Sequence, residues 1–573
     1  MLYKIILLIV LYMMKMTYSE YRKTSVMIDT DTIIETISDR FLSVTLDTSF
    51  IQDNWSTLNF SSPKVQVLAK ALSPCYLRVG GSSADYLQFD SSSQSEIYQK
   101  VPKEFILTDR INKKLTNFTM IARQWDELNG FAEMVGWDLI FDLNSLLRQN
   151  GQWLPDNAKL LMDYTSQKGY KIAGWELGNE PDVYKDVGPS VTMLVKEISR
   201  KYLQDFVDAG GPDIVTNPTF HHKYTKSYVH IKREPDVYKD VGINITGAQR
   251  AKDYNILHSL LNHYPQWRNG IVIGPSVTML VKEISRKYLQ DFVDAGGPDI
   301  VNQSYIPSRS NSSFKLREVN NPIFHHYYDY GPSMTVPKFM APDILSNLPW
   351  QINVAKKIAP FPLFGKFWLG ETSSAWGGGA AGLSDRYVAG FMWLDKLGIS
   401  ASLGVDVVVR QTFYGGSYGL IDTKTSNPNP DFWLSYLYKK LVGRSVFNVT
   451  MDDNKGYVRM YTHCTNTQRS DYKPGSITVY GMNLRQEPTT VVFTQFKPDI
   501  KLHLYLLEPV GVESLKSQTI ALNGRTLSLN PDFSLPSMDY PEVVTSNFTF
   551  PQQSFGFIVI PEANVAACKM SSL

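Results

Sequence analysis

The alternation of short apolar runs with longer amphipathic stretches, which begins near residue 40, is the feature that most constrains how this chain folds. Apolar runs of strand length that alternate with helical periodicity are typical of repeated βα units. The candidate strands are residues 41–46, 75–79, 137–143, 172–177, 271–273, 323–328, 366–370 and 405–410. Because eight parallel strands close a barrel, the sequence predicts an α/β fold with a (β/α)8 TIM barrel over residues 40–441.

The stretches between these strands carry apolar residues at helical spacing. Residues 157–168, 248–262, 277–295, 343–358 and 384–397 are therefore expected to form the outer ring of helices. After about residue 442 the pattern changes to short alternating strands, such as residues 476–480, 490–493, 502–507 and 555–560, separated by Pro, Gly and Asn. This pattern predicts an attached β-sandwich over residues 442–573, which the strand-like segment within residues 20–39 is expected to join.

The first 19 residues are predicted to be a signal peptide. Lys4 precedes an apolar run at residues 5–14, and Lys15 and small or polar residues follow it. That length is too short for a membrane span, and no later run approaches twenty apolar residues. Asn-x-Ser/Thr sequons agree with a secreted or lysosomal glycoprotein, and they begin at Asn54, Asn59, Asn117, Asn244, Asn302, Asn311, Asn448 and Asn547.

Charge and cysteine content narrow the class of protein. The 57 Lys and Arg residues nearly balance the 55 Asp and Glu residues, and the net charge of +2 argues against a nucleic-acid partner. Three cysteines are too few for a disulfide scaffold, but a secreted protein can hold one bridge. Cys464 and Cys568, both in the strand-rich C-terminal region, are expected to form it, whereas Cys75 in an apolar strand is expected to be a buried free thiol.

Two glutamates stand at the ends of apolar strands, where barrel enzymes gather their catalytic groups. Glu180 lies in the string GWELGNEP at residues 174–181, and Glu371 lies in WLGETSS at residues 368–374. A carboxylate pair suits glycoside hydrolysis, because one acid protonates the leaving oxygen while the other carboxylate attacks or stabilises the sugar carbon. For either glutamate alone, an exposed strand-end charge is the plain alternative. The histidines lack metal-ligand spacing, so neither a metal nor a cofactor is expected.

One segment is duplicated in a way that no regular repeat explains. Residues 180–188 (EPDVYKDVG) recur unchanged at 234–242, and residues 188–215 recur unchanged at 274–301. The first pair is 54 residues apart and the second 86, whereas a solenoid keeps one period. Identity over 28 residues at unequal spacing is typical of a duplicated exon or an assembly error.

The second copy continues as the barrel requires, so residues 189–233 are predicted to be an insertion. The polar, Ser- and Asn-rich residues 302–318 are predicted to be another. Glu234 repeats the context of Glu180 on its C-terminal side only, because Arg233 precedes it and no apolar strand leads into it. Glu180 is therefore the expected acid.

Several motifs resemble those of the heparanase family of secreted endo-β-glucuronidases. The resemblance covers most of the chain and is strongest in FLSVTLD (41–47), YLRVGG (76–81), GWELGNEP (174–181), FHHYY (324–328), WLGETSSAWGGGA and GFMWLDKLG (within 368–398), and KKLVG and HCTNT (within 439–467). It implies a retaining β-glucuronidase on a barrel with an attached β-sandwich, acting on heparan sulfate or a related glycosaminoglycan.

The resemblance also implies roles for single residues. Glu180 would be the general acid/base and Glu371 the nucleophile, with carboxyl groups about 5 to 5.5 Å apart. Matching positions that bind the substrate are Asp47, Ser82 and Asn179 for sugar hydroxyls, Tyr327, Tyr418, Gly377 and Gly378 for the sugar carboxylate, and Lys113 and Lys114 for sulfate. His325 would orient the neighbourhood of the nucleophile or be a buried structural histidine. Arg410 would polarise a catalytic carboxylate or form a structural ion pair.

Two departures from the family pattern keep the substrate open. Vertebrate-type members carry an Arg-containing basic stretch where this chain has residues 276–281 (SVTMLV), and the linker that the family excises is short here, at residues 91–112. The missing cations would suit hyaluronan, which has no sulfates, better than heparan sulfate. The sequence also leaves room for a non-catalytic glycosaminoglycan-binding relative, and for a chain that its insertion inactivates.

Overall fold

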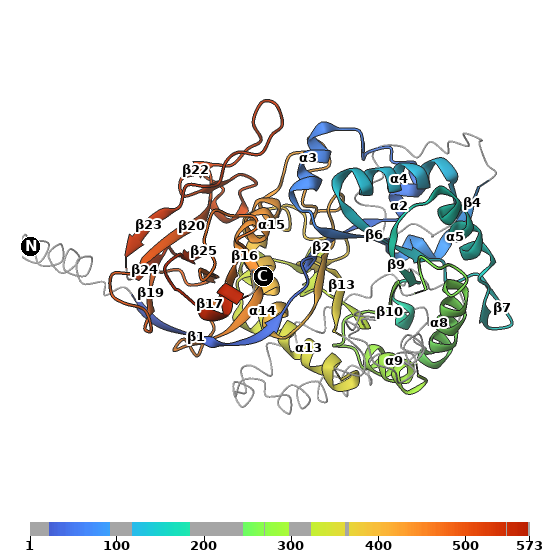
Figure 1. Cartoon of the computed structure of the whole chain (residues 1–573), viewed down its shortest axis with the longest axis horizontal. Coiled ribbons are helices and arrows are strands. Elements are labelled where there is room, and N and C mark those ends of the chain that lie inside the picture. Colours follow the sequence, from blue (N-terminus) through green and yellow to red (C-terminus); the bar gives the residue numbers. More distant parts are fainter. Residues whose placement is uncertain are drawn as a thin grey trace, which may run out of the picture.

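The computed structural model describes residues 22–91, 117–183, 245–268, 270–296, 322–360, 366–545 and 547–570. Eight parallel strands form a closed barrel in the order β10-β11-β13-β15-β2-β3-β6-β9. Their bounds are β2 Leu42–Asp47, β3 Cys75–Gly80, β6 Trp137–Leu143, β9 Ile172–Leu177, β10 Ile271–Val277, β11 Pro322–His326, β13 Trp368–Thr372 and β15 Val407–Arg410. Each strand pairs with the next one along the chain and β15 closes on β2, which confirms the predicted barrel (Figure 1).

Helices surround the barrel, one main helix after each strand (Figure 1). They are α3 Pro63–Ala71, α4 Ala122–Val135, α5 Asp156–Lys168, α8 Gly247–Leu261, α9 Glu283–Asp294, α13 Asn347–Ile358, α14 Ala389–Ser402 and α15 Pro430–Leu441. A separate apolar cluster lies inside the barrel and is made of residues from β6, β10, β11, β13 and β15, which are the buried Ile140, Ile273, Ile323, Trp368, Val407 and Val409. The barrel interior is thus a packed core and not a pore.

Some predicted boundaries were wrong for identifiable reasons. The strand expected to end at residue 273 continues to Val277, so helix α9 begins at Glu283 and not at residue 277. Helix α14 continues beyond the predicted end at residue 397, through Gly398. A Cβ at Gly398 would lie 2.1 Å from the ring of Tyr461, so the glycine is there because the C-terminal sheet packs directly on the helix.

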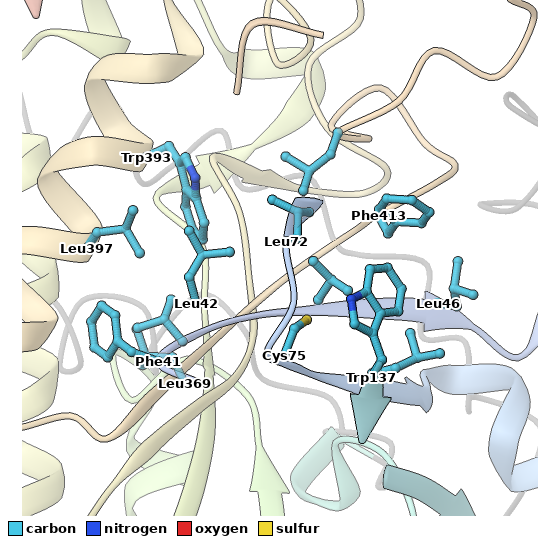
Figure 2. Packing of buried hydrophobic residues seen from close by; sticks show 14 of the residues in the cluster. Phe41, Leu42, Leu46, Leu72, Cys75, Trp137, Leu369, Trp393, Leu397 and Phe413 are labelled. Carbon is cyan, nitrogen blue, oxygen red and sulfur yellow. The ribbon is translucent and has the colours of Figure 1, made fainter. Parts of the chain in front are cut away.

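The main hydrophobic core lies between the strands and the helices. Figure 2 shows Leu42, Leu46, Cys75, Trp137 and Phe413 gathered on one side of the barrel wall. The rings of Trp137 and Phe413 meet edge to face at 4.9 Å between centroids. Cys75 is the buried free thiol that the sequence predicts, and burial raises its pKa to about 11, so it stays protonated and unreactive.

The C-terminal part is β-rich, as predicted, and its strands belong to one eleven-stranded sheet. These strands are β1 Arg22–Thr36, β16 Val442–Met451, β17 Val458–Thr465, β18 Ile477–Asn483, β19 Thr489–Phe493, β20 Lys501–Pro509, β21 Ile520–Leu522, β22 Arg525–Thr526, β23 Glu542–Thr545, β24 Asn547–Phe550 and β25 Ser554–Ile560. A single sheet results because the long strand β1 pairs antiparallel with β16 and parallel with β19. The sheet encloses its own apolar core, and Cys464 and Cys568 form the predicted disulfide beside it.

Helix α14 joins the two parts of the molecule (Figure 1). Gly390 packs against Phe555 and Gly398 against Tyr461, both from the sheet, while Trp393 and Leu397 contribute to the core of the barrel (Figure 2). The helix therefore has one side on each domain.

Several predictions fall on residues outside the described ranges. They are the signal peptide at residues 1–19, Lys113 and Lys114, the insertions at residues 189–233 and 302–318, and Glu234. Across the described ranges, no helix has both the length and the apolar composition needed to cross a membrane.

Candidate active site

The two predicted glutamates face each other at the C-terminal end of the barrel. Glu371 lies in β13, and Glu180 follows β9 by three residues. One carboxylate oxygen of each, together with a ring nitrogen of His325 from β11, all lie within 4.8 Å of one another. The side chains of Glu180 and Glu371 are 22% and 12% exposed, so both are partly accessible to solvent.

Glu371 is held in the ionised form by its neighbours. Arg78 Nη1 donates to Oε2 at 2.9 Å, and the Tyr327 hydroxyl donates to Oε1 at 2.6 Å. Burial raises the pKa of Glu371, but the charges of His325 and Arg78 and these two hydrogen bonds outweigh burial, so its pKa is lowered from the usual value. A buried carboxylate that remains charged and accessible can act as a nucleophile.

Tyr327 lies beside Glu371, and its hydroxyl donates to the carboxylate oxygen Oε1. Its contact with a sugar carboxylate stays a prediction. Burial, followed by the negative charge of Glu371, raises the pKa of Tyr327 well above its usual value, so the side chain stays a neutral donor. The structure therefore places Tyr327 as an orienting group for Glu371.

A buried arginine connects the two glutamate-bearing strands. Arg78 on β3 donates to Glu176 through Nε at 2.6 Å and Nη2 at 3.0 Å, and to the Asn179 side-chain oxygen at 2.9 Å, in addition to Glu371. The guanidinium passes close to Gly80, where a Cβ would lie only 3.0 Å from the guanidinium carbon. The absence of a side chain at Gly80 therefore leaves room for Arg78. Planar bidentate geometry of this kind needs arginine and not lysine.

The backbone at Glu180 is strained. Its φ is +50°, and that of Ser276 at the end of β10 is +57°, both in the left-handed region that side chains other than glycine avoid. The Glu180 N–H donates to the Ser276 carbonyl at 3.0 Å, and Asp182 accepts from Thr278 and Ser285. These contacts hold the turn after β9 against β10, which is how the strain is maintained.

His325 is the buried, hydrogen-bonded histidine that is one of its two predicted interpretations. Its Nδ1 lies 2.9 Å from Oε1 of Glu180, and a ring nitrogen also lies within 4.8 Å of a carboxylate oxygen of Glu371. The imidazole is fully buried, and Nε2 has no hydrogen-bond partner among the described residues. The position of this ring is therefore set by its strand and by Glu180.

Asp47, Ser82 and Asn179 lie at or just after the C-terminal ends of β2, β3 and β9. Asp47 ends β2 and accepts from the Ser49 N–H at 2.9 Å, and Ser82 follows β3 as the first residue of a short 3-10 helix, half-buried. Asn179 is buried and accepts from Arg78. Gly81 has a φ of +105°, and a Cβ at this residue would lie 3.0 Å from the Asp47 carboxylate. Glycine therefore allows the backbone to approach Asp47 closely.

The glycine run after β13 forms a turn that a backbone hydrogen bond holds in place. Gly377, Gly378 and Gly379 all have positive φ, and the Gly378 carbonyl accepts from the Ser417 N–H at 2.7 Å. The ring of Tyr418 lies 2.9 Å from where a Cβ at Gly379 would stand. The structure thus brings Gly377, Gly378 and Tyr418 together, as the resemblance implies.

Arg410 takes the structural role of the two that the sequence allows. Its guanidinium forms a buried ion pair with Asp431 at 2.8 Å and donates to the Tyr418 carbonyl at 2.9 Å. Arg410 therefore supports the loop that carries Tyr418.

The sequence prediction missed Arg78 and Glu176. A signal was present, because each is a charged residue inside an apolar strand, in YLRVGG and GWELGNEP. Charged groups in such positions are buried only when they are paired.

Glu180, His325 and Glu371 are also the group that offers metal-ligand atoms within the described part of the chain. Both oxygens of Glu371 already accept hydrogen bonds, one from Arg78 and one from Tyr327, and a cation here would lie close to the positive charge of Arg78. The arrangement suits an acid and a nucleophile better than a metal centre.

Comparison with known proteins identifies the family of the chain. Residues 23–209 match glycosyl hydrolase family 79, N-terminal domain. Heparanase of Gallus gallus is 32% identical over 93% of this chain and 94% of its own length, and hyaluronoglucuronidase of Hirudo nipponia is 31% identical over 96% and 100%. In fold, the chain is similar to the crystal structure of a 4-O-α-L-rhamnosyl-β-D-glucuronidase from Fusarium oxysporum. The TM-score is 0.55 and the identity is 14%, and the match covers 91% of this chain and 96% of that one. The chain therefore belongs to the heparanase family within glycosyl hydrolase family 79 and is a glycoside hydrolase.

Proposed function

We propose that the protein is an endo-β-glucuronidase that hydrolyses internal glucuronidic bonds of a glycosaminoglycan with net retention of configuration. The observation that carries this proposal is the approach of the Glu180 and Glu371 carboxylates to within 4.8 Å between oxygens. Retaining enzymes need carboxyl groups about 5 to 5.5 Å apart, whereas inverting enzymes need about 6.5 to 9.5 Å to admit a water.

The residues support a double displacement. Glu371, ionised and held by Arg78 and Tyr327, attacks the anomeric carbon while Glu180 gives its proton to the leaving oxygen. The C1–O bond breaks as the ester bond to Glu371 forms. Glu180 then takes a proton from water, which attacks the same carbon and releases Glu371. Both proton transfers of Glu180 occur beside His325, which can exchange a hydrogen bond with either protonation state.

Heparan sulfate is the leading substrate, since the motifs are those of heparanases and one such relative matches nearly the whole chain. A specific observation favours hyaluronan as a second candidate. Residues 276–281 lack a cation, and Ser276, Val277, Thr278 and Leu280 are buried, so this segment offers no sulfate-binding surface. The leech relative of similar identity is a hyaluronoglucuronidase.

Secretion or lysosomal delivery through the signal peptide at residues 1–19 is part of the proposal. Support comes from the sequons at Asn59, Asn448 and Asn547, whose side chains are exposed and therefore accessible to glycosylation. Treatment of the expressed protein with an N-glycosidase should lower its apparent mass.

The stereochemical outcome tests the proposed mechanism. Proton NMR of the first product of an activated aryl β-glucuronide should show the β-anomer before mutarotation, and Glu371→Gln should abolish its formation. Initial appearance of the α-anomer would contradict retention while leaving glucuronidase activity intact.

A further inference from the structure

A buried lysine lies directly behind the two strands that carry the reacting groups. Lys396 of α14 is 1% exposed and donates to the His326 carbonyl at 3.2 Å, the Ser373 carbonyl at 2.7 Å and the hydroxyl of Thr372. His326 ends β11 and Thr372 ends β13. All three acceptors therefore lie where the ladder between these strands stops.

Three oxygen atoms surround the side-chain nitrogen of Lys396, and an ammonium ion has one N–H donor for each of them. The Thr372 hydroxyl also contacts the His326 carbonyl, so the same oxygen is tied to both strands. Burial, followed by the charge of Arg410, lowers the pKa of Lys396, and Asp395 opposes them. The face of the Tyr328 ring, 4.7 Å away, adds cation–π stabilisation.

The residues next to these acceptors are those of the active site. His325 precedes His326 and contacts Glu180, and Glu371 precedes Thr372. In the register of the two strands His325 lies opposite Glu371, after an irregularity that follows Phe324. The ladder between β11 and β13 is therefore irregular just before these residues, and the side-chain nitrogen of Lys396 contacts both strands where they end beyond it.

The lysine is itself held by the C-terminal sheet. Its neighbour Asp395 forms a buried ion pair with Arg459 of β17 and accepts from the Tyr461 hydroxyl at 2.6 Å. Gly390 and Gly398 pack the same helix onto Phe555 and Tyr461. The position of Lys396 thus depends on a domain that contributes none of the catalytic-site residues identified above.

We propose that Lys396 is a positioning residue, which clamps the ends of β11 and β13 and so sets the relative placement of Glu371 and His325, with the C-terminal sheet as its support. This role rests on the proposed retaining mechanism. It acts on geometry and not on substrate affinity, so its loss should lower kcat and leave KM nearly unchanged.

Lys439 provides a matched control. It is a buried lysine on the neighbouring helix α15, and it also donates to a backbone carbonyl, that of Pro74. Pro74 precedes β3, at the N-terminal end of the barrel and away from the glutamates. Lys439→Met therefore removes the same kind of contact from the opposite end of the fold.

The experiment compares wild type, Lys396→Met and Lys439→Met on an activated aryl β-glucuronide, with thermal melting as the measure of folding. A second readout is the rate at which a 2-deoxy-2-fluoro-β-glucuronosyl fluoride labels Glu371, followed by mass spectrometry. We expect kcat and the labelling rate of Lys396→Met to fall about 10- to 100-fold, as for a displacement approaching 1 Å, with KM within about twofold. Lys439→Met should keep kcat within about twofold of wild type.

If folded Lys396→Met and Lys439→Met have equal kcat, the positioning role of Lys396 is overturned, but the retaining mechanism is not. If Lys396→Met does not fold, Thr372→Val decides, because it removes only the hydroxyl between the ammonium and the His326 carbonyl. We expect a decrease in kcat of about 3- to 10-fold for it, and an unchanged kcat would overturn the role. Failure of the wild-type protein to be labelled would instead overturn the retaining mechanism, and this role with it.

Discussion

Arg78 Nη1 lies 2.9 Å from Oε2 of Glu371, and the same guanidinium is bound by Glu176 from the other side. Glu176 is fully buried, so its charge is neutralised within the protein. The arginine therefore pairs with three carboxylates, the fully buried Glu176 and Asp142, the latter at 3.9 Å, and the partly exposed Glu371. Removing it would leave buried charge unpaired, which costs about 3 to 5 kcal/mol in comparable sites.

Arg78→Lys should lower kcat/KM by about 100-fold, because an ammonium keeps the charge but cannot reach Glu176, Asn179 and Glu371 together. The sign of the pH effect follows from the ionised state that Glu371 needs. Arg78 helps to lower the pKa of Glu371, so weaker contact raises that pKa and moves the acidic limb of the kcat/KM profile to higher pH. The profile is measured for both proteins across the acidic range.

Arg148→Lys is the control for that experiment. Arg148 forms a bidentate ion pair with buried Asp253, at 2.9 and 3.0 Å. Arg148 contacts none of the candidate catalytic residues, so the acidic limb of the kcat/KM profile of Arg148→Lys should coincide with that of wild type. If Arg78→Lys and Arg148→Lys shift this limb by the same amount, Arg78 does not act on Glu371.

Glu180→Ala should lower hydrolysis of natural glycosidic bonds by about 100- to 10,000-fold, because the leaving oxygen loses its proton donor. Activated aryl glucuronides need less acid assistance and should be affected less. Added azide should restore turnover and give the β-glucuronosyl azide, identified by NMR. Glu234→Gln, which changes the duplicated glutamate, should retain full activity, and loss of activity there would contradict the assignment of Glu180.

Replacing Cys464 and Cys568 by serine should lower the free energy of unfolding by about 2 to 4 kcal/mol, because the disulfide closes a long loop in the unfolded chain. The bridge spans 104 residues and lies in the C-terminal sheet, away from the glutamates. Chemical denaturation should therefore show lower stability with unchanged kcat at 25 °C. An unchanged midpoint would mean that the bridge does not form in solution.

Deleting residues 189–242 removes the extra copy of the duplicated sequence and joins Gly188 to Ile243. The described contacts of Glu180 with Ser276, and of Asp182 with Thr278, use residues that remain. The shortened chain should therefore keep kcat within about twofold and express at higher yield, since a long insertion adds aggregation-prone states during folding. Loss of activity in a folded, shortened protein would show that the segment contributes to the site.

The barrel could be predicted from sequence because its strands are covered on both faces and read as continuous apolar runs. Boundaries were less predictable where tertiary packing decides them. Gly398 looks like a helix end in the sequence, but Tyr461 of a distant strand occupies the place of its missing side chain. Val277 continues a strand whose last residues are held by the turn that carries Glu180.

The glutamates of the site were predictable because each ends a strand, which is a local property. The partners of those glutamates are not local. Arg78, Glu176 and Glu371 come from β3, β9 and β13, and the partners of Tyr327 and His325 depend on side-chain directions that sequence spacing does not determine. The strand pattern therefore identified the two candidate catalytic glutamates but not the residues that hydrogen-bond to them.

The most direct test of the account is reducing-end release from heparan sulfate and from hyaluronan by the purified protein, with Glu371→Gln as the matched variant. We predict that the wild-type protein shortens at least one polymer, with internal cleavage visible as a rapid decrease in chain length, and that Glu371→Gln does not. Cleavage of hyaluronan alone would choose the second candidate substrate. Absence of cleavage of both polymers by folded wild-type protein, or cleavage that persists in Glu371→Gln, would contradict the proposed function.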